Sequence, residues 1–199
     1  MNQQLIAILI SLPALLICIT VHEFAHAYVA VKMGDPTPEE HGRLTLNPLA
    51  HLDPIGTLML IIVHFGWAKP VPINPYNFRN RKQGIILTSI AGPISNFLMA
   101  ILGAFLYRFI FPTQNPGLKM FIETFVFINI VLGLFNLLPF PPLDGSRLIT
   151  VFIPPKYNHI ANFLERYGFF FLIGILLLFP NVIGRLISPI AYHLLRLFL

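Results

Sequence analysis

Long runs of apolar residues divide this chain into segments that match the thickness of a lipid bilayer. A helix needs about 20 residues to cross the hydrocarbon core, and the run at residues 4–31 carries no charged side chain before Glu23. Hydrophobic residues make up 56% of the 199 residues and charged residues only 11%, unlike an ordinary soluble domain. Because an α-helix satisfies its own backbone hydrogen bonds in lipid, the sequence predicts an all-α integral membrane protein.

The other apolar runs predict five to six membrane helices in a single polytopic domain, residues 1–199. Four further apolar runs predict membrane spans: residues 84–107, 120–138, 167–184 and 186–199. The last of these runs is the least apolar, and it could either cross the membrane or lie at its interface. The core is expected in residues 5–150, with additional C-terminal helices in residues 157–199.

A shorter apolar stretch at residues 54–67 cannot make a full crossing. Prolines follow at positions 70, 72 and 75, and so many prolines exclude a regular helix. Irregular backbone is tolerated at membrane depth only where protein or a wet cavity shields it. We therefore expect a helix that enters part-way and then a re-entrant extended loop around residues 66–80. His64, in the short stretch, is expected to make an ordinary polar contact.

The distribution of Lys and Arg predicts the orientation. If residues 32–82 and 147–166 share a side, that side holds most of the positive charges, while the opposite loop holds only Arg108 and Lys119. By the positive-inside rule the richer side is cytoplasmic. No basic cluster with interleaved aromatics is present, so the formal charge of +5 indicates topology in a multi-pass cell-membrane protein and not a nucleic-acid partner.

His22, Glu23 and His26 lie inside the first apolar run. Residues four apart share a helix face, so both imidazoles can reach one zinc ion with the glutamate beside its open position. Ionisable groups are costly in lipid and are usually functional there. The motif lies roughly 12–18 Å along the helix from the break at Gly34, at 1.5 Å per residue, so we expect a site inside the bilayer, toward the cytoplasmic side.

A catalytic zinc usually takes three protein ligands, and the third must come from elsewhere. Asp144 follows an apolar span that ends in prolines at the depth of the histidines, which favours a ligand over a helix cap. Asp35, in a turn-rich loop, is expected to be solvated. His51 and Asp53 are expected to form a cap and turn before residue 55, with direct contact to the metal as the alternative; Asp53 could also hydrogen-bond to a metal-bound imidazole.

These motifs resemble the site-2 protease family, zinc metalloproteases that cleave peptide bonds within membranes. Four motifs carry the resemblance, in the family's order: residues 22–26, 66–75, 91–96 and 136–145. The chain is similar to a minimal member without an accessory PDZ or CBS module. The resemblance implies that one Zn²⁺ per chain is held by three residues: His22, His26 and Asp144. It also implies that Glu23 is the general base and that Asn136, with Pro139 in the same motif, helps to position the substrate.

The chemistry can be argued from the residues as well. Zinc lowers the pKa of a bound water and polarises the scissile carbonyl, and Glu23 can take the proton and pass it to the leaving amine. Asn136 can donate a hydrogen bond to the substrate or make an interhelical bond instead. A substrate helix must unwind before attack, and the extended loop could pair with it as an added strand. The loop residues concerned are Lys69, Pro70, Val71, Pro72 and Asn74.

The sequence therefore predicts an intramembrane zinc metalloendopeptidase that acts on single-span membrane proteins or signal-peptide-like substrates. A metal-ion transporter is the second candidate, but Glu23 occupies the general-base position and transporter-like repeats are absent. A non-catalytic membrane scaffold is the third, disfavoured because every residue that the chemistry requires is present. Neither the substrate's identity nor the oligomeric state follows from the sequence.

Overall fold

The computed structural model describes residues 3–63, 66–110 and 115–199. These residues are nearly all helical and hold no β-strand, only an isolated antiparallel bridge between Leu52 and Ala68. The long helices are α1 (Gln3–Met33), α4 (Arg81–Phe105), α5 (Pro116–Asn136), α7 (Asn158–Leu178) and α8 (Pro180–Phe198). The short elements are α2 (Thr37–Glu40), η1 (Pro48–Ala50), α3 (Pro54–Val63), η2 (Leu106–Ile110), α6 (Asp144–Thr150) and η3 (Pro155–Tyr157). The predicted all-α class is confirmed; the prediction for His64 lies outside the described residues.

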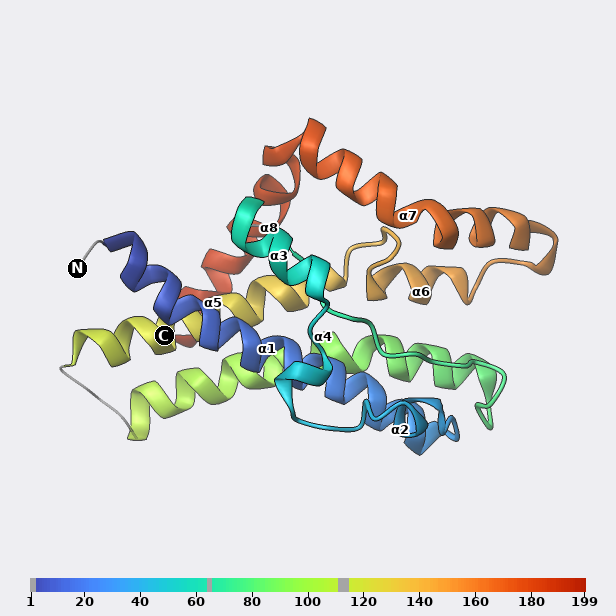
Figure 1. The fold of residues 1–199 in the computed structure, drawn as a ribbon, viewed down its shortest axis with the longest axis horizontal. Helices are drawn as coiled ribbons and strands as arrows, with labels where there is room; N and C mark the ends of the chain where they lie inside the picture. The colour runs from blue at the N-terminus through green and yellow to red at the C-terminus, as the bar shows by residue number, and fades with distance from the viewer. Residues whose placement is uncertain (1–2, 64–65, 111–114) are drawn as a thin grey trace.

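Three long helices, α1, α4 and α5, pack side by side, and α8 packs against α5 (Figure 1). Where α4, α5 and α8 meet, the buried core combines small and branched apolar side chains: Ala100, Ala104, Ile122, Val126, Ile130, Ile187 and Ala191. Small residues let helix backbones approach closely where lipid provides no hydrophobic drive for association. The bundle of α1, α4 and α5 is the scaffold on which the functional residues are placed.

Four helical segments among the described residues are long and apolar enough to cross a membrane: Leu9–Met33, Arg81–Phe109, Pro116–Asn136 and His159–Leu178. The count of five to six is therefore not reached by this measure, because the 19-residue α8 does not qualify. The expected span at residues 167–184 is wrong in its limits. Phe179 leaves the helical conformation, with φ −134° and ψ 60°, and Pro180 starts α8, since proline lacks the N–H that would continue α7.

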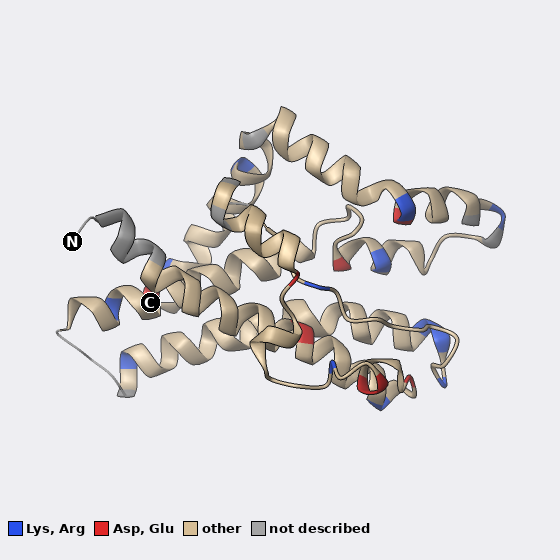
Figure 2. Ribbon diagram, viewed as in Figure 1, with Lys and Arg blue, Asp and Glu red and all other residues tan. Residues whose placement is uncertain are grey.

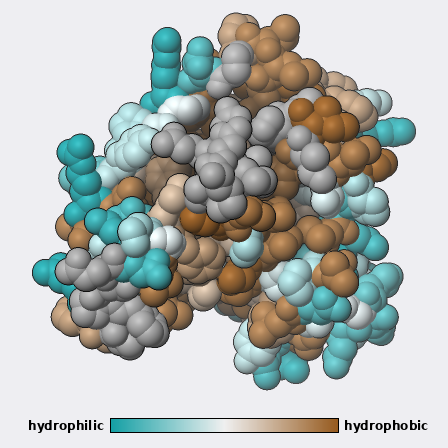
Figure 3. Space-filling model, turned by 60° about the vertical axis from the view of Figure 1, so that its left-hand side comes forward, coloured by the Kyte–Doolittle hydropathy of each residue, from teal (hydrophilic) through white to brown (hydrophobic). Residues whose placement is uncertain are grey.

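Charged residues lie mainly toward the ends of the helices and in the connecting segments (Figure 2). The end of the bundle formed by α2, the start of α4 and the start of α7 holds more of them than the end where α4 leads to α5. Hydrophobic residues cover much of the centre and the top of the face in Figure 3, and hydrophilic ones gather mainly at its left, right and lower margins. Apolar surface of this kind suits contact with lipid.

Hydrogen bonds to Asp35, which we call the polar latch, join the end of α1 to Asn74 and Asn77 of the extended segment. Gly34 has φ +109°, a backbone conformation that is strained for a residue with a side chain. The turn at Gly34 places Asp35 next to the extended segment. The buried Asp35 carboxylate accepts hydrogen bonds from the backbone N–H of Thr37 and Asn74 and from Asn77 Nδ2, at 3.1, 2.7 and 2.9 Å. The expectation of a solvated Asp35 is therefore wrong.

The predicted non-helical segment is also observed, since no helix lies between Gly66 and Asn80. A Cβ on Gly56 would lie 2.2 Å from the Trp67 carbonyl oxygen, and one on Gly66 would lie 2.3 Å from that of Gly56. These two glycines thus let α3 pack directly against the start of the extended segment. The segment then runs alongside α1, at the level of Glu23.

Candidate active site

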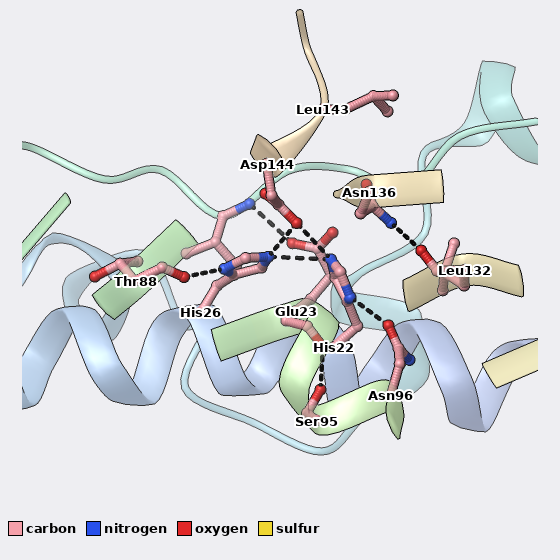
Figure 4. Close-up of polar contacts among 12 residues, drawn as sticks. His22, Glu23, His26, Thr88, Ser95, Asn96, Leu132, Asn136, Leu143 and Asp144 are labelled. Carbon is pink, nitrogen blue, oxygen red and sulfur yellow. Dashed lines mark hydrogen bonds and ion pairs between the residues drawn. The ribbon is translucent and has the colours of Figure 1, made fainter. Parts of the chain in front are cut away.

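The two histidines of α1 and the first residue of α6 meet in one buried cluster (Figure 4). His22 Nε2 and His26 Nε2 lie 3.2 and 3.1 Å from Asp144 Oδ2, and 3.0 Å from each other. Both imidazoles are 5% exposed. All three potential ligand atoms lie within 4.8 Å of one another. The structure therefore brings together the three residues that the sequence singled out.

Asp144 reaches the histidines because the chain turns back sharply after α5. The helix ends at Asn136, and α6 starts at Asp144 after a proline-rich connection. A Cβ on Gly145 would lie 2.2 Å from the Leu137 carbonyl oxygen, so only glycine allows α6 to start this close to the end of α5. The prolines end one helix, and the glycine lets the next one begin against it.

Hydrogen bonds at the far side of each ring set the state of the two imidazoles. His26 Nδ1 lies 2.7 Å from the Thr88 carbonyl oxygen, which can only accept, so Nδ1 carries the proton. His22 Nδ1 lies 2.7 Å from Asn96 Oδ1 and donates in the same way. In neutral rings both Nε2 atoms then present lone pairs, toward each other and toward a carboxylate. Such a set of converging electron pairs fits a cation, and two imidazoles with a carboxylate are ligands that zinc prefers.

Gly92 makes room for this cluster on α4. A Cβ there would lie 2.3 Å from His26 Nε2 and 2.6 Å from His22 Nε2. The backbone of α4 therefore passes directly against the imidazole faces. At this glycine, α4 packs against the candidate ligands themselves.

Glu23 lies beside the cluster and contacts the extended segment. Its Oε2 accepts a hydrogen bond from the Val71 backbone N–H at 3.2 Å. The buried Arg43 side chain donates from Nη2 to the Lys69 carbonyl oxygen. Burial lowers the pKa of Arg43, while the charge of Glu23 acts in the opposite direction. The segment is thus held between a carboxylate and a guanidinium.

The other predicted substrate-positioning residues lie around this site without bonding to the cluster. Asn136 Nδ2 donates to the Leu132 carbonyl oxygen of its own helix at 3.1 Å, and Pro139 is exposed on the connection to α6. In the extended segment the Lys69 N–H donates to the His51 carbonyl oxygen at 2.9 Å. Pro70 is exposed, Val71 buried and Pro72 half-buried, and Asn74 is held by the polar latch.

His51 and Asp53 have structural contacts away from the metal cluster. His51 is fully buried, with Nε2 2.8 Å from the Thr45 carbonyl oxygen. Asp53 Oδ1 accepts from the Gly56 N–H at 2.7 Å, as a cap of α3. The cap-and-turn interpretation of this motif agrees with the geometry, and neither side chain bonds to His22, His26 or Asp144 in the part of the chain that the structure describes.

Two contributors to the site were missed from the sequence. Asn129 on α5 was not considered, although it is a polar residue within an apolar run, and it lies fully buried next to Asn96. The Thr88 carbonyl could not be found from sequence, because any residue type supplies such an oxygen. Asn129 could have been found by the rule that intramembrane polar groups have partners.

Comparisons with known proteins agree with this site. Residues 111–175 match the model of peptidase family M50. The chain is 44% identical over 177 residues to a Bacillus subtilis protein named "Putative zinc metalloprotease YwhC", covering 85% of this chain and 80% of that protein. It is 30% identical over 183 residues to Rip2 of Mycolicibacterium smegmatis, named in the same words, covering 89% of this chain and 69% of that protein.

A more distant relative is the zinc metalloprotease MJ0392 of Methanocaldococcus jannaschii, 27% identical over 148 residues, which are 74% of this chain and 35% of that protein. No solved structure matches the chain. The long match to the Bacillus protein shows that the chain belongs to peptidase family M50, the site-2 proteases. It is accordingly a zinc metalloprotease and a multi-pass membrane protein. Of the three functions considered from the sequence, the protease is the one these relatives support.

Proposed function

We propose that this metalloprotease is an intramembrane endopeptidase that hydrolyses a peptide bond within or near a transmembrane segment of another membrane protein. One observation carries the proposal. His22 and His26 lie on α1, which is apolar enough to span a bilayer, and Asp144 at the start of the short α6 meets them there, with Glu23 beside the cluster. A peptidase whose metal site lies among membrane spans must receive its substrate there.

In this proposal the zinc ion is held by His22, His26 and Asp144. When bound, it supplies a Lewis acid that activates water and polarises the scissile carbonyl. Glu23 accepts the proton from the attacking water and delivers it to the leaving amine. Its hydrogen bond to the Val71 N–H keeps the carboxylate oriented next to the metal ligands. Asn136 gives up its bond to Leu132 and donates to the substrate backbone.

The extended segment is the part that receives the unwound substrate. Pro70 and Pro72 have no N–H to donate, but their carbonyl oxygens can accept hydrogen bonds. The N–H groups of an unwound substrate backbone can donate to these oxygens. The Val71 N–H points to Glu23, so substrate bound along this segment lies next to the general base. Single-span proteins and signal-peptide-like segments with a helix-weakening Gly, Pro or Asn near the cut fit this arrangement.

The active site is oriented toward the cytoplasm. The end of the bundle that holds α2 and the start of α4 carries more charged residues than the opposite end, Lys and Arg among them (Figure 2). The positive-inside rule places such an end in the cytoplasm.

The proposal is tested by reconstituting the purified chain in liposomes with single-span reporter proteins that differ only in the helix-weakening residues of their membrane segment. We expect zinc-dependent cleavage at one bond inside the segment, located by mass spectrometry of the products. Glu23→Gln should abolish cleavage, because general acid–base catalysis contributes about 10²–10⁴-fold or more to such reactions. Glu39→Gln, on the exposed surface of α2, is the matched control and should cleave normally. Cleavage confined to soluble loops, or full activity of Glu23→Gln, would contradict the proposal.

A further inference from the structure

A line of buried hydrogen bonds leads from His22 away from the metal cluster and across two neighbouring helices. On α4, Asn96 Oδ1 accepts a hydrogen bond from His22 Nδ1 at 2.7 Å. Asn96 Nδ2 in turn donates to Asn129 Oδ1 on α5 at 3.1 Å. Asn129 Nδ2 then donates to the Phe125 carbonyl oxygen of its own helix at 2.9 Å. Both asparagines are 0% exposed. The proposed chemistry uses neither of them.

The direction of this line is fixed at its far end. A backbone carbonyl only accepts hydrogen bonds, so Asn129 must turn its NH₂ group toward Phe125 and its oxygen toward Asn96. Asn96 must then present its NH₂ group to Asn129 and its oxygen to His22. His22 can donate a hydrogen bond to Asn96 Oδ1 only if its ring carries the proton on Nδ1. The α5 backbone thereby selects the ring nitrogen that is left free to bind a metal.

The thiol of Cys18 joins the same line, one helical turn before His22. Its Sγ donates to Asn129 Oδ1 at 3.2 Å, and its carbonyl oxygen lies 3.4 Å from Asn96 Nδ2. Three helices are therefore connected at this point: α1, α4 and α5. Each polar atom of the two amides has a partner, which is the condition for a polar network to be stable away from water.

We infer that Asn96 and Asn129 are positioning residues for the metal site, acting through His22 by holding its tautomer and ring orientation. This inference rests on the proposed role of His22 as a zinc ligand. A hydrogen bond to the far nitrogen of a metal-bound histidine raises its basicity and prevents the ring from turning, and losing such a partner typically lowers metal affinity about 10–100-fold. Asn129 acts only through Asn96, so its removal has the smaller effect.

The test measures zinc affinity of the purified full-length protein in detergent, by competition with a chromophoric chelator. We expect Asn96→Leu to weaken zinc binding about 10–100-fold and Asn129→Leu to weaken it by a smaller factor. Asn96→Asp keeps an oxygen for His22 and, as the neutral acid, supplies an O–H that can donate to Asn129 Oδ1, so it should restore most of the affinity. In the double variant the Asn129 change should add almost nothing, because residues in one network are not additive.

Thr20→Val is the matched control. Thr20 is buried on α1, two positions before His22, and its hydroxyl donates to the Leu16 carbonyl oxygen of the same helix at 2.6 Å, so the change leaves the bonds of Asn96 and Asn129 in place. Cobalt(II) substitution gives a second measurement, since the visible spectrum of the bound ion reports the ligand geometry. A shifted spectrum in Asn96→Leu, with wild-type spectra in Asn96→Asp and Thr20→Val, is the expected result.

Equal zinc affinity and an unchanged cobalt spectrum in Asn96→Leu would overturn the inference, as would an equal loss in Thr20→Val. The proposed metal site has its own measurement in the same series. If His22→Ala keeps full zinc affinity, the ligand assignment fails. If His22→Ala loses zinc and Asn96→Leu does not, only the positioning role fails.

A cavity beside the cluster carries a second, independent inference. It has a volume of about 830 Å³ and lies between the end of the extended segment, the start of α4, α6 and the start of α7. Its lining includes Thr88 and Ser146, and these residues adjoin the metal cluster because the Thr88 carbonyl bonds to His26 and Ser146 follows Asp144 by two positions. Four residues of the extended segment line it and directly continue the part proposed to hold the substrate: Ile73, Pro75, Tyr76 and Phe78.

The cavity carries a positive charge. Arg81, Lys82 and Arg147 line it against a single carboxylate, Glu165, and Lys and Arg appear in blue at the start of α4 and on α6 in Figure 2. The first turn of a helix already favours anions, so two cations there are placed against the helix dipole. No carboxylate lies within 4.0 Å of these three cations in the described ranges.

Aromatic rings, and not acidic side chains, are the neighbours of two of these cations. Arg81 lies 4.6 Å from the centre of the Tyr76 ring, and Lys82 lies 4.2 Å from that of Phe152. Cations in a cleft with apolar walls concentrate their field on whatever enters it. We infer that the cavity accepts an acidic side chain of the substrate, a few residues from the cut on its cytoplasmic side. This second inference also rests on the proposed function.

The test compares two single-span reporters in liposomes of neutral lipid, one with an Asp-Glu pair and one with a Lys-Arg pair placed about four to eight residues from the cut. We expect the acidic reporter to be cleaved about 10-fold faster at low salt, and the preference to disappear or reverse in the Arg81→Glu/Arg147→Glu variant. Arg108→Glu, at the opposite end of the bundle, is the control and should keep the preference.

Equal cleavage of the two reporters would overturn the inference about the cavity while leaving the endopeptidase intact, whereas no cleavage of either would count against the proposed function. Addition of an anionic lipid supplies the remaining comparison. If that lipid changes both rates equally, and this effect is lost in the Arg81→Glu/Arg147→Glu variant, the cavity holds a lipid headgroup and the substrate assignment is wrong.

Discussion

At the scale of single residues, the site depends on glycines, which have no side chain, as much as on the residues that carry the chemistry. Gly92 has no side chain, and this absence allows the α4 backbone to lie against both imidazoles. Asp144 reaches the histidines only because Gly145 lets α6 begin against the end of α5. The two histidines thus depend on a glycine of the opposing helix α4, and Asp144 depends on the glycine that follows it on α6.

Gly92→Ala should accordingly disrupt the metal site. The new Cβ would lie 2.3 Å from His26 Nε2, so the ring or the helix must move. We expect zinc affinity to fall at least about 10-fold, in the range seen when the supports of a metal ligand are disturbed. Gly174→Ala, where a Cβ would have no neighbour within 4 Å, should bind zinc normally. Isothermal titration of the two apo-proteins would show whether Gly92→Ala keeps full affinity, which would contradict this account.

Much of the site could be predicted at this scale, because its chemistry requires particular residues. His22 and His26 are recognisable from their spacing, and Asp144 from its place after a span. The environment of Asp35 was predicted incorrectly, since a turn-rich loop suggests solvent and only the folded chain shows the extended segment lying over it. The partner of each Nδ1 atom comes from a distant helix and has no local signature.

At the scale of elements, the extended segment is held by contacts on both of its ends. Asp35 receives the Asn74 N–H, and His51 and Arg43 hold the backbone of Lys69. The proline content predicts that the segment is not helical, which the structure confirms. The boundary between α7 and α8 was missed because Phe179 and Pro180 stand inside a continuous apolar run, where hydropathy does not show a turn.

Replacing residues 70–75 with a flexible Gly/Ser segment should separate the two parts of the proposed mechanism. The proposed metal ligands are on α1 and α6, so zinc content should remain that of the wild type. Cleavage of a single-span reporter should fall strongly, because an ordered strand for pairing is lost. Metal analysis and cleavage are measured on the same preparation. Undiminished cleavage would show that the segment does not hold the substrate.

The latch should also make the extended segment sensitive to acid. Burial raises the pKa of Asp35, but hydrogen bonds from Thr37, Asn77 and Asn74 outweigh it and keep the pKa below its ordinary value. The latch therefore stabilises the fold fully above the unfolded-state pKa of about 3.9, and this stability is lost as the pH falls through the lower folded-state value.

We expect Asp35→Asn to be less stable than the wild type at neutral pH, by about 1–3 kcal/mol for the lost charge-assisted hydrogen bonds. The difference in thermal unfolding midpoint should shrink as the pH is lowered below about 4. Glu39→Gln, an exposed substitution on α2, should follow the wild type. A difference that is constant with pH would rule out the carboxylate as its source.

At the scale of the whole molecule, an apolar bundle carries a buried polar centre near one of its ends. The composition and the apolar runs predicted a membrane protein, and the four qualifying spans agree with that class. The number of crossings was less predictable, since α8 packs on α5 with a strongly one-sided distribution of apolar residues. A helix of that kind suits an interfacial position as well as a span.

The proposed orientation predicts which ends of the helices a membrane-impermeant thiol reagent can reach. Glu39→Cys, after α1, should react only once the membrane is opened, whereas Lys119→Cys, at the start of α5, should react in intact cells. Both positions are exposed, and the native Cys18 is fully buried and provides an unreactive background. The reverse pattern would place the active site toward the outside.

The zinc content of the detergent-purified protein, measured beside Glu23→Gln and Asp144→Ala, tests the central claim most directly. We predict about one tightly held zinc per chain, retained in Glu23→Gln and strongly reduced in Asp144→Ala. Glu39→Gln serves as the control for handling. Zinc that is indifferent to the loss of Asp144, or that is lost together with Glu23, would contradict the assignment of His22, His26 and Asp144 as the ligands and Glu23 as the base.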